Sequence, residues 1–111
     1  MRKLFLAAAL FAATAAPSAA QTVYPYRPVA GAQHGLAVSS ATSLSIPTAA
    51  SYATICARAA AVNYTTDGVT APTASVGTPI AAGNCVGLPG TLLPTFSALG
   101  SGATLDVEYF K

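Results

Sequence analysis

The sequence has little charge and few of the residues from which catalytic and metal sites are built. It contains no tryptophan, one histidine and two cysteines, and charged residues make up 7% of the chain. One histidine and three acidic residues are too few to assemble a base with an oriented partner, or a set of metal ligands. The sequence therefore predicts a protein that is not an enzyme and that uses no metal or cofactor.

The few charges also bear on the class of partner. Outside an N-terminal basic pair, three cations stand against three carboxylates: Arg27, Arg58 and Lys111 against Asp67, Asp106 and Glu108. Such a chain lacks the basic patch that binds nucleic acid or anionic membranes. A neutral chain also has little colloidal repulsion. We therefore expect no nucleic-acid partner, and we do expect a protein partner or self-association.

Residues 1–20 have the three parts of a secretory signal peptide. A basic pair begins the segment, an apolar run interrupted only by Thr14 fills residues 4–16, and small residues precede a cleavage site after Ala20. The run is shorter than the roughly 20 residues that span a bilayer. We expect cleavage without stable membrane insertion, and export of the mature chain to the bacterial periplasm or the extracellular space.

The mature chain divides into an arm, residues 21–35, and a domain, residues 36–111. Pro25 and Pro28 favour extended conformations in the residues that precede them, so the arm is predicted to be irregular or polyproline-like. Its tyrosines would pack on the domain or on a partner, or the arm would hang free. His34, near the end of the arm, has no second ligand or carboxylate nearby in the sequence, which is typical of a surface or capping residue.

The domain shows the period-2 alternation of half-buried β-strands. Alternation over residues 36–46 predicts one strand, or two strands broken near Ser39 and Ser40. Tyr52 begins another strand, in which Ala53, Ile55 and Ala57 share a face. In the last strand, residues 103–110, the apolar face alternates with Thr104, Asp106 and Glu108. With about seven short strands and no convincing helix, the sequence predicts an all-β fold, a small antiparallel β-sandwich of Ig-like or jelly-roll type.

One stretch, residues 62–80, specifies more local structure than any other. Its strand stops at Asp67 and Gly68, a pair that turns the chain because Asp bonds to its own backbone and Gly adopts positive φ without steric cost. Pro72 and Gly77 follow in a segment that has no room for a helix. The turn geometry explains Asp67 without calcium or sugar contact.

The same stretch resembles a known family. The segments Tyr64-Thr65-Thr66-Asp67-Gly68, Pro72-Thr73 and Gly77-Thr78-Pro79-Ile80-Ala81-Ala82-Gly83 are similar to a motif of small β-sandwich proteins of phages and prophages, which also end on an alternating aromatic strand. The similarity covers residues 40–111, with Ala71 inserted into the usual spacing. A shorter part is similar to Ig-like modules of secreted glycoside hydrolases. The resemblance implies a structural, accessory role; the export signal of residues 1–20 is a departure from the family, since a virion protein would not need it.

The two cysteines, Cys56 and Cys85, predict a disulfide, because an exported chain with an even cysteine count meets an oxidising compartment. The bridge would close a loop of roughly 30 residues around the turn motif. No Cys-x-x-Cys pattern favours a metal or redox pair.

Tyrosines are the remaining candidates for binding. Tyr64 and Tyr109 fall on inward strand positions, whereas Tyr24, Tyr26 and Tyr52 are candidates for exposure, and exposed aromatic rings stack on sugars or bury in protein interfaces. Asp106 and Glu108 are interpreted as solvated edge protection. The sequence thus predicts an exported, non-enzymatic structural or protein-interaction module; the alternative is a carbohydrate-binding or adhesion module at the cell surface.

Overall fold

A computed structural model describes residues 26–111. The expected signal peptide, residues 1–20, and Tyr24 lie outside the described residues. The described part consists of seven strands and one 3₁₀ helix: β1 (Pro28–Ala37), β2 (Tyr52–Arg58), β3 (Val62–Thr65), β4 (Thr78–Ile80), β5 (Cys85–Pro89), η1 (Gly90–Thr95), β6 (Ser97–Leu99) and β7 (Thr104–Phe110). The predicted all-β fold and the number of strands are confirmed.

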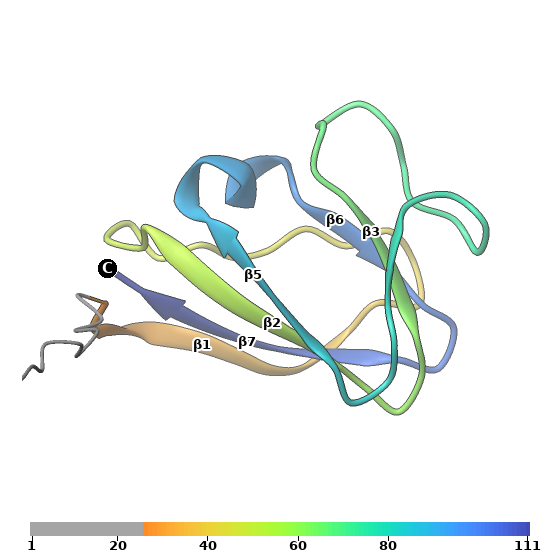
Figure 1. Ribbon diagram of the computed structural model, residues 1–111, viewed down its shortest axis with the longest axis horizontal. Coiled ribbons are helices and arrows are strands. Elements are labelled where there is room, and N and C mark those ends of the chain that lie inside the picture. Colours follow the sequence, from red (N-terminus) through yellow and green to blue (C-terminus); the bar gives the residue numbers. More distant parts are fainter. Residues whose placement is uncertain (1–25) are drawn as a thin grey trace, which may run out of the picture.

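The strands form two antiparallel sheets that face each other (Figure 1). The four-stranded sheet has the order β1-β7-β2-β5, and the three-stranded sheet has the order β4-β3-β6. Most connections between consecutive strands cross from one sheet to the other. Strand β7, the last in the chain, lies between β1 and β2. Outside the named strands, Thr42 forms an isolated antiparallel bridge with Ala98 of β6.

The core lies between the sheets and is built from the inward side chains of both. The four-stranded sheet contributes Ile55, Leu105 and Val107, and the three-stranded sheet contributes Val62 and Ala98, all of which are at most 1% exposed. Because successive strand residues point to opposite faces, the buried inward positions of β2 and β7 alternate with half-buried or exposed ones. The face assignments predicted for Ala53, Ile55 and Ala57 and for the last strand are confirmed.

The prediction of an irregular arm over residues 21–35 is wrong for residues 28–35, while residues 21–25 lie outside the described part. Residues Pro28–Ala37 form β1, which pairs with β7 along its length. The sequence of β1 does not show the alternation of a strand, because its pairing with β7 has register shifts on both sides of Gln33. Such bulges break the period of two. Gly31 (φ +114°) and Gly35 (φ +69°) lie at these irregularities. Both have positive φ, which glycine adopts without steric cost.

The strand predicted over residues 36–46 is also wrong over most of its length. Strand β1 ends at Ala37, and the chain then crosses to the other sheet, where only Thr42 pairs with another strand. Leu44 and Ile46 still pack against the core from this segment. The alternation therefore predicted correctly that side chains of this segment are buried. Burial alone does not supply a partner for the backbone hydrogen bonds of a strand.

The segment between β3 and β4 forms the predicted turn. The Asp67 carboxylate accepts hydrogen bonds from the N–H groups of Val69 (3.0 Å) and Thr70 (2.8 Å), and from the Thr70 hydroxyl (2.6 Å). Gly68 has φ +74°, as expected at this position. Pro72 is more than a turn residue, since it is among the fully buried side chains and anchors the loop to the core.

Candidate functional site

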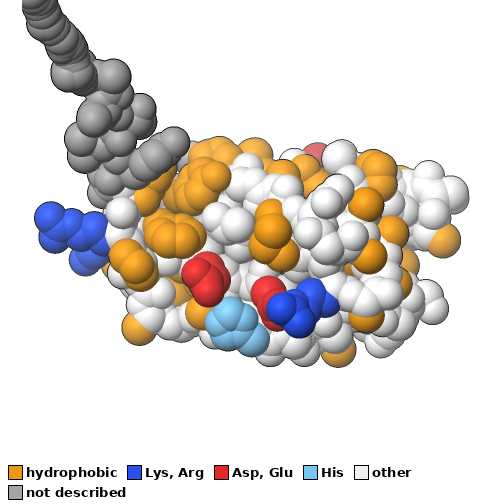
Figure 2. All heavy atoms as spheres, turned by 60° about the horizontal axis from the view of Figure 1, so that its bottom comes forward, with side chains coloured by type: hydrophobic (Ala, Val, Ile, Leu, Met, Phe, Trp, Pro, Cys, Tyr) orange, Lys and Arg blue, Asp and Glu red, His pale blue; other side chains and the backbone are white. Residues whose placement is uncertain are grey.

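The candidate site is the outer face of the four-stranded sheet, the face turned away from the core. Because inward and outward positions alternate, the outward side chains of β2 and β7 lie side by side: Tyr52 opposite Phe110, Thr54 opposite Glu108 and Cys56 opposite Asp106. Figure 2 shows that acidic, histidine and arginine side chains gather in a row on one face of the molecule, beside hydrophobic side chains. The outer face therefore has an aromatic end and a charged end.

At the aromatic end, three rings form what we call the aromatic cluster: Tyr26, Tyr52 and Phe110. Tyr26 stacks on Tyr52 with ring centroids 4.8 Å apart and planes 22° apart, and Tyr52 meets Phe110 at 6.2 Å and 54°. The rings and Thr54 line a shallow apolar hollow of about 340 Å³. Tyr26 is 46% exposed. The cluster thus presents apolar surface to solvent at the end of the sheet.

Gly87 of β5 makes room for this cluster. A Cβ atom built on Gly87 would lie 1.8 Å from the Tyr52 hydroxyl oxygen, so the Tyr52 ring extends over the neighbouring strand. The ring covers backbone that a side chain would otherwise cover, a packing known from glycines in sheets. Gly87 lies in the middle of β5.

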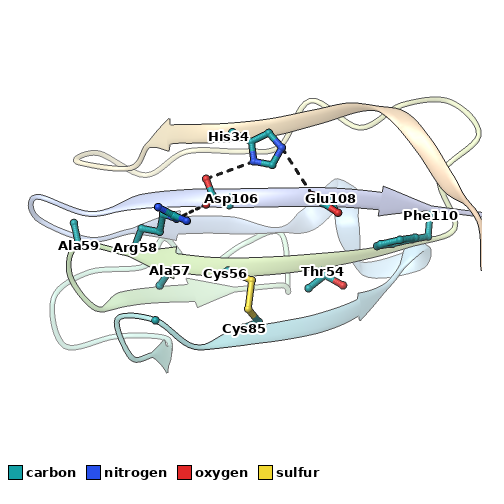
Figure 3. A pocket seen from close by; sticks show the side chains of 11 residues that line it. His34, Thr54, Cys56, Ala57, Arg58, Ala59, Cys85, Asp106, Glu108 and Phe110 are labelled. Atoms are coloured by element: carbon teal, nitrogen blue, oxygen red, sulfur yellow. Dashed lines mark ion pairs between the residues drawn. A yellow bond between two sulfur atoms is a disulfide. The ribbon is translucent and has the colours of Figure 1, made fainter.

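At the other end, four side chains form what we call the charged row: Arg58, Asp106, His34 and Glu108. Asp106 forms an ion pair with Arg58, and its Oδ1 lies 3.7 Å from His34 Nδ1. The other ring nitrogen of His34 lies 3.9 Å from Glu108 Oε2 (Figure 3). His34 is a surface residue, as predicted, with its side chain 61% exposed, and the pairing of β1 with β7 brings it between two carboxylates that are distant in the sequence.

The Asp106 carboxylate has a structural partner as well as charged ones. The N–H of Gly35 donates to Asp106 Oδ1 at 2.9 Å. This bond lowers the pKa of Asp106 below its ordinary value; partial desolvation opposes the shift, and the charges of Arg58 and His34 support it. The Asp106 side chain thus accepts a hydrogen bond from Gly35, in the irregular part of β1, and links β7 to β1.

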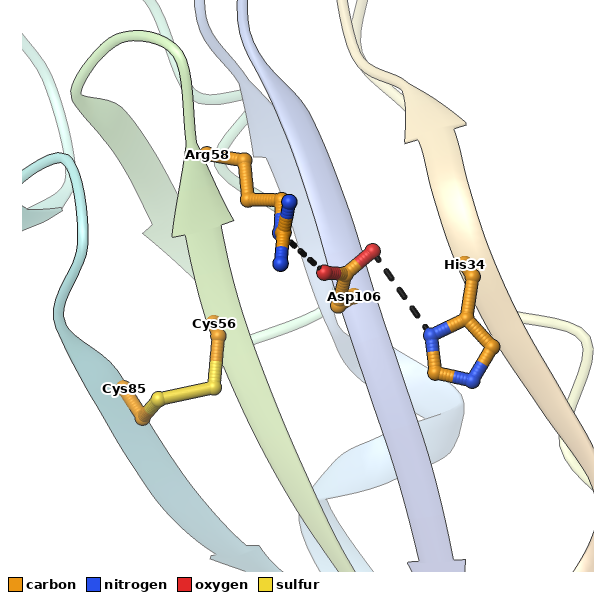
Figure 4. The surroundings of a disulfide bond; sticks show 5 residues. All are labelled: His34, Cys56, Arg58, Cys85 and Asp106. Carbon is orange, nitrogen blue, oxygen red and sulfur yellow. Dashed lines mark ion pairs between the residues drawn. A yellow bond between two sulfur atoms is a disulfide. The ribbon is translucent and has the colours of Figure 1, made fainter.

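The predicted disulfide between Cys56 and Cys85 is confirmed, and it lies on the same outer face. The two residues are directly paired on β2 and β5, with Cα atoms 3.9 Å apart and 29 positions apart in the sequence. Figure 4 shows the bridge next to Arg58 and Asp106. A hollow of about 700 Å³ extends over the bridge and the charged row, with Phe110 at its far end. The outer face is therefore one continuous surface from the aromatic cluster to Arg58.

His34, Asp106 and Glu108 do not have the geometry of a metal site. The two carboxylates approach opposite nitrogens of the imidazole, whereas ligands of one ion must converge on one point. No group of three His, Cys, Asp or Glu side chains within residues 26–111 is suited to hold a metal ion. What these residues supply is two carboxylates on either side of an imidazole.

Of the predicted binding aromatics, Tyr26 and Tyr52 come together, while Tyr24 lies outside the described residues. The sequence analysis missed Phe110 as the third ring, although the alternation of the last strand put it on the outward face. Tyr109 is buried as expected, and Tyr64 is only half-buried, packed on Phe96 with ring centroids 5.4 Å apart.

Comparison of the chain with protein-family models, with curated proteins and with solved structures yields no match. Within residues 26–111, no helix is long and apolar enough to cross a membrane. A disulfide in a small β-rich domain is consistent with an oxidising, exported compartment.

Proposed function

We propose that this chain is an exported, non-enzymatic β-sandwich protein that acts as a structural or protein-interaction module, an accessory protein of the phage and prophage type. Its binding surface is the outer face of the four-stranded sheet. The observation that carries the proposal is the aromatic cluster, in which Tyr26 is exposed and Tyr52 and Phe110 are half-buried, next to charged side chains. Exposed aromatic rings with a polar border are typical of the centre of protein interfaces.

The surroundings of the cluster indicate the chemistry of the partner. Glu108 stands beside the cluster with its side chain 59% exposed, and the His34 ring nitrogen Nε2 lies 3.9 Å from its Oε2. Asp106 and Arg58 are already engaged with each other. The partner that fits is a protein surface with an apolar side chain for the aromatic cluster, flanked by a Lys or Arg for Glu108.

The strand order supports the jelly-roll type of β-sandwich over the Ig-like type. In a jelly roll, the last strand returns between the first strand and a strand from the middle of the chain. Strand β7 lies between β1 and β2 in this way, and the segment at Thr42 stands beside β6 where an eighth strand belongs. The Ig-like partial resemblance, and the glycoside hydrolase context it implies, therefore receive less support.

Glycan binding is the second candidate, because aromatic rings beside a carboxylate are also found in sugar sites. The stacking of Tyr26 on Tyr52 argues against it, since each ring covers a face of the other. A sugar platform needs ring faces that are open to the ligand. A protein contact can use ring edges as well as faces.

The test is site-specific photo-crosslinking of the full-length chain in its own cells. A benzophenone amino acid replaces Tyr26, and a matched control replaces Val69, which is 89% exposed in the loop after β3. We expect one discrete protein adduct from position 26, lost when Tyr52→Ala is added, and none from position 69. The intact mass of the recovered chain should be that of residues 21–111 less two hydrogens, as expected for a chain that begins at Gln21 and contains the disulfide.

Three results would contradict the proposal. Adducts that are identical from both positions would show that the outer face has no special partner. A recovered chain that keeps residues 1–20 would remove the export step. Absence of any adduct, together with glycan binding that Tyr52→Ala abolishes, would favour the carbohydrate-binding alternative.

A further inference from the structure

We infer that the free edge of β5 is a self-association site, through which two copies of this chain join their four-stranded sheets by antiparallel strand pairing. Strand β5 is the last strand of the sheet order β1-β7-β2-β5, so only one of its edges is paired, with β2. A free strand edge presents a row of N–H and C=O groups that can pair with another strand. This site uses the backbone of β5 and is separate from the aromatic cluster proposed above.

The hydrogen bonding of β2 with β5 fixes which groups of β5 are free. Ala57 N–H donates to Asn84 C=O (3.0 Å) at one end, and Gly90 N–H donates to Ser51 C=O (2.7 Å) at the other. In an antiparallel pair, bonded and non-bonded residue pairs alternate. Cys85 and Gly87 therefore belong to the non-hydrogen-bonded pairs, in which they lie opposite Cys56 and Thr54. Their N–H and C=O groups point away from β2. Within residues 26–111, these groups have no backbone partner.

The other three sheet edges are protected in ways that β5 is not. Strand β1 is bulged twice, and its Gly31 is in contact with Pro47. Strand β4 has three residues, of which the middle one is Pro79, with no N–H to offer. Strand β6 is bridged to Thr42 through Ala98, in both directions. Bulges, proline and covering segments are the usual protection of strand edges.

Strand β5 lacks each of these protections over its first four residues. Its pairing with β2 runs without a register shift, and its proline, Pro89, stands at the very end. From Gly68 to Leu105 the sequence contains no Asp, Glu, Lys, Arg or His, so β5 and the segments before and after it carry no charge. Val86, on the inner face, is only half-buried against the core. An added strand would cover its exposed part.

A second copy of β5 is the occupant that this edge fits. Antiparallel pairing about a twofold axis at Gly87 joins Gly87 with Gly87 of the second copy through two bonds, and Cys85 N–H with Pro89 C=O in both directions. An axis at Val86 pairs Cys85 with Gly87 and also yields four bonds. Twofold contacts are self-complementary, which makes them the commonest interface of homo-oligomers. An uncharged edge imposes no repulsion between copies.

The test uses the mature chain and variants in which Tyr52→Ala opens the space above Gly87. Gly87→Pro in this background removes the outward N–H, and so two of the four bonds in either register; Gly87→Ala is the matched control that keeps it. By sedimentation we expect Tyr52→Ala and Tyr52→Ala/Gly87→Ala to form dimers. Tyr52→Ala/Gly87→Pro should associate about 30-fold more weakly.

Amide hydrogen exchange of the unaltered chain tests the same contact without a variant. The N–H groups of Cys85 and Gly87 should exchange fast in dilute samples and slowly in concentrated ones, while Ile55, in the middle of the sheet, stays protected in both. A chain that stays monomeric at all concentrations, or equal association of the Pro and Ala variants, would overturn the inference. Tyr52→Ala separates the two proposals, since it removes the crosslinked partner but leaves self-association intact.

Discussion

The four-stranded and the three-stranded sheets share one core but are held together by different interactions. The four-stranded sheet has strands of up to ten residues, a disulfide and the ion pair of Arg58 with Asp106. The strands of the three-stranded sheet have three or four residues. They depend on side chains that bond to loop backbone: Asn63 donates to Thr73 C=O (2.7 Å), Thr65 to Thr70 C=O (2.7 Å) and Thr95 to Thr66 C=O (2.6 Å).

The two sheets therefore have different roles in this small domain. Long strands produce a broad outer face, and all charged side chains of the described residues except that of Asp67 lie on the four-stranded sheet or next to its ends. The three-stranded sheet closes the other side of the core with little backbone pairing. We therefore expect changes in the four-stranded sheet to affect the stability of the whole domain, and changes in the loops of the three-stranded sheet to act locally.

The largest effect is expected from removing the disulfide. The bridge lies in the four-stranded sheet, yet the loop that it closes contains β3 and β4, so it restricts both sheets in the unfolded chain. In the chain-entropy account, a loop of this length corresponds to about 3–4 kcal/mol in the free energy of unfolding. Cys56→Ala/Cys85→Ala should lower stability by this amount in denaturant unfolding. Equal unfolding midpoints for the oxidised and reduced wild type would contradict it.

A smaller effect is expected from Tyr109→Phe. The Tyr109 hydroxyl donates to Gln33 Oε1 at 2.6 Å, and the same oxygen accepts the N–H of Ser45. Loss of one such bond reduces the free energy of unfolding by about 1 kcal/mol. The variant also tests whether the bulged half of β1 depends on side-chain contacts, since Gln33 lies between its two irregularities.

Tyr109 also predicts an alkaline dependence of stability. Burial raises the pKa of Tyr109 to about 12, from the ordinary value of 10.0. As the pH rises, the unfolded chain therefore loses this proton before the folded chain does. The contribution of Tyr109 to the free energy of unfolding is complete below pH 10 and is lost as the pH rises to about 12. Unfolding curves at pH 8 and pH 11 should differ less for Tyr109→Phe than for wild type. The other tyrosines are common to both proteins, so an identical pH dependence would contradict the prediction.

The smallest effect is expected in the loop that supports the three-stranded sheet. The Thr70 hydroxyl, followed by the N–H groups of Thr70 and Val69, lowers the pKa of Asp67 from 3.8 to about 2. The stabilisation of the turn is therefore complete above pH 3.8 and is lost as the pH falls through about 2. The amide signals of Val69 and Thr70 should titrate near pH 2 in the wild type, and Asp67→Asn should abolish this.

The four-stranded sheet supplies the control for this titration. The amide of Ile55, in the middle of β2, should not follow the Asp67 titration if the loop responds locally. A midpoint near pH 4 would mean that the carboxylate lacks its three donors. A common transition of Ile55 and Thr70 would mean that the two sheets respond as one unit, against the distinction drawn here.

Much of the fold follows from local pattern, and the failures have a common cause. Strands β2 and β7 were predicted with the correct faces because their alternation is regular, and the Asp67 turn was predicted because its bonds are made within four residues. Strand β1 was missed because its bulges hide the alternation. The strand predicted at 36–46 is mostly absent, because alternation indicates burial and not a pairing partner.

The candidate site was predictable only in part. The sequence singles out both Tyr26 and Tyr52 as candidates for exposure, but Tyr26 and Phe110 are far from Tyr52 in the sequence. They meet it only through the pairing of β1, β7 and β2. His34 and Asp106, likewise, lie on strands from opposite ends of the described chain. No spacing rule links such residues, since the register of the ladder decides which side chains become neighbours.

By itself, then, the sequence determined the all-β composition, the inward and outward faces of its regular strands, the turn at Asp67 and the cysteine pair, because each depends on residues close together or on simple counting. The tertiary structure alone decided the place of β1, the gathering of aromatic and charged side chains on one outer face, and the free edge of β5. These depend on which strands are neighbours, and strand pairing is a long-range choice that is made by the packing of the whole core.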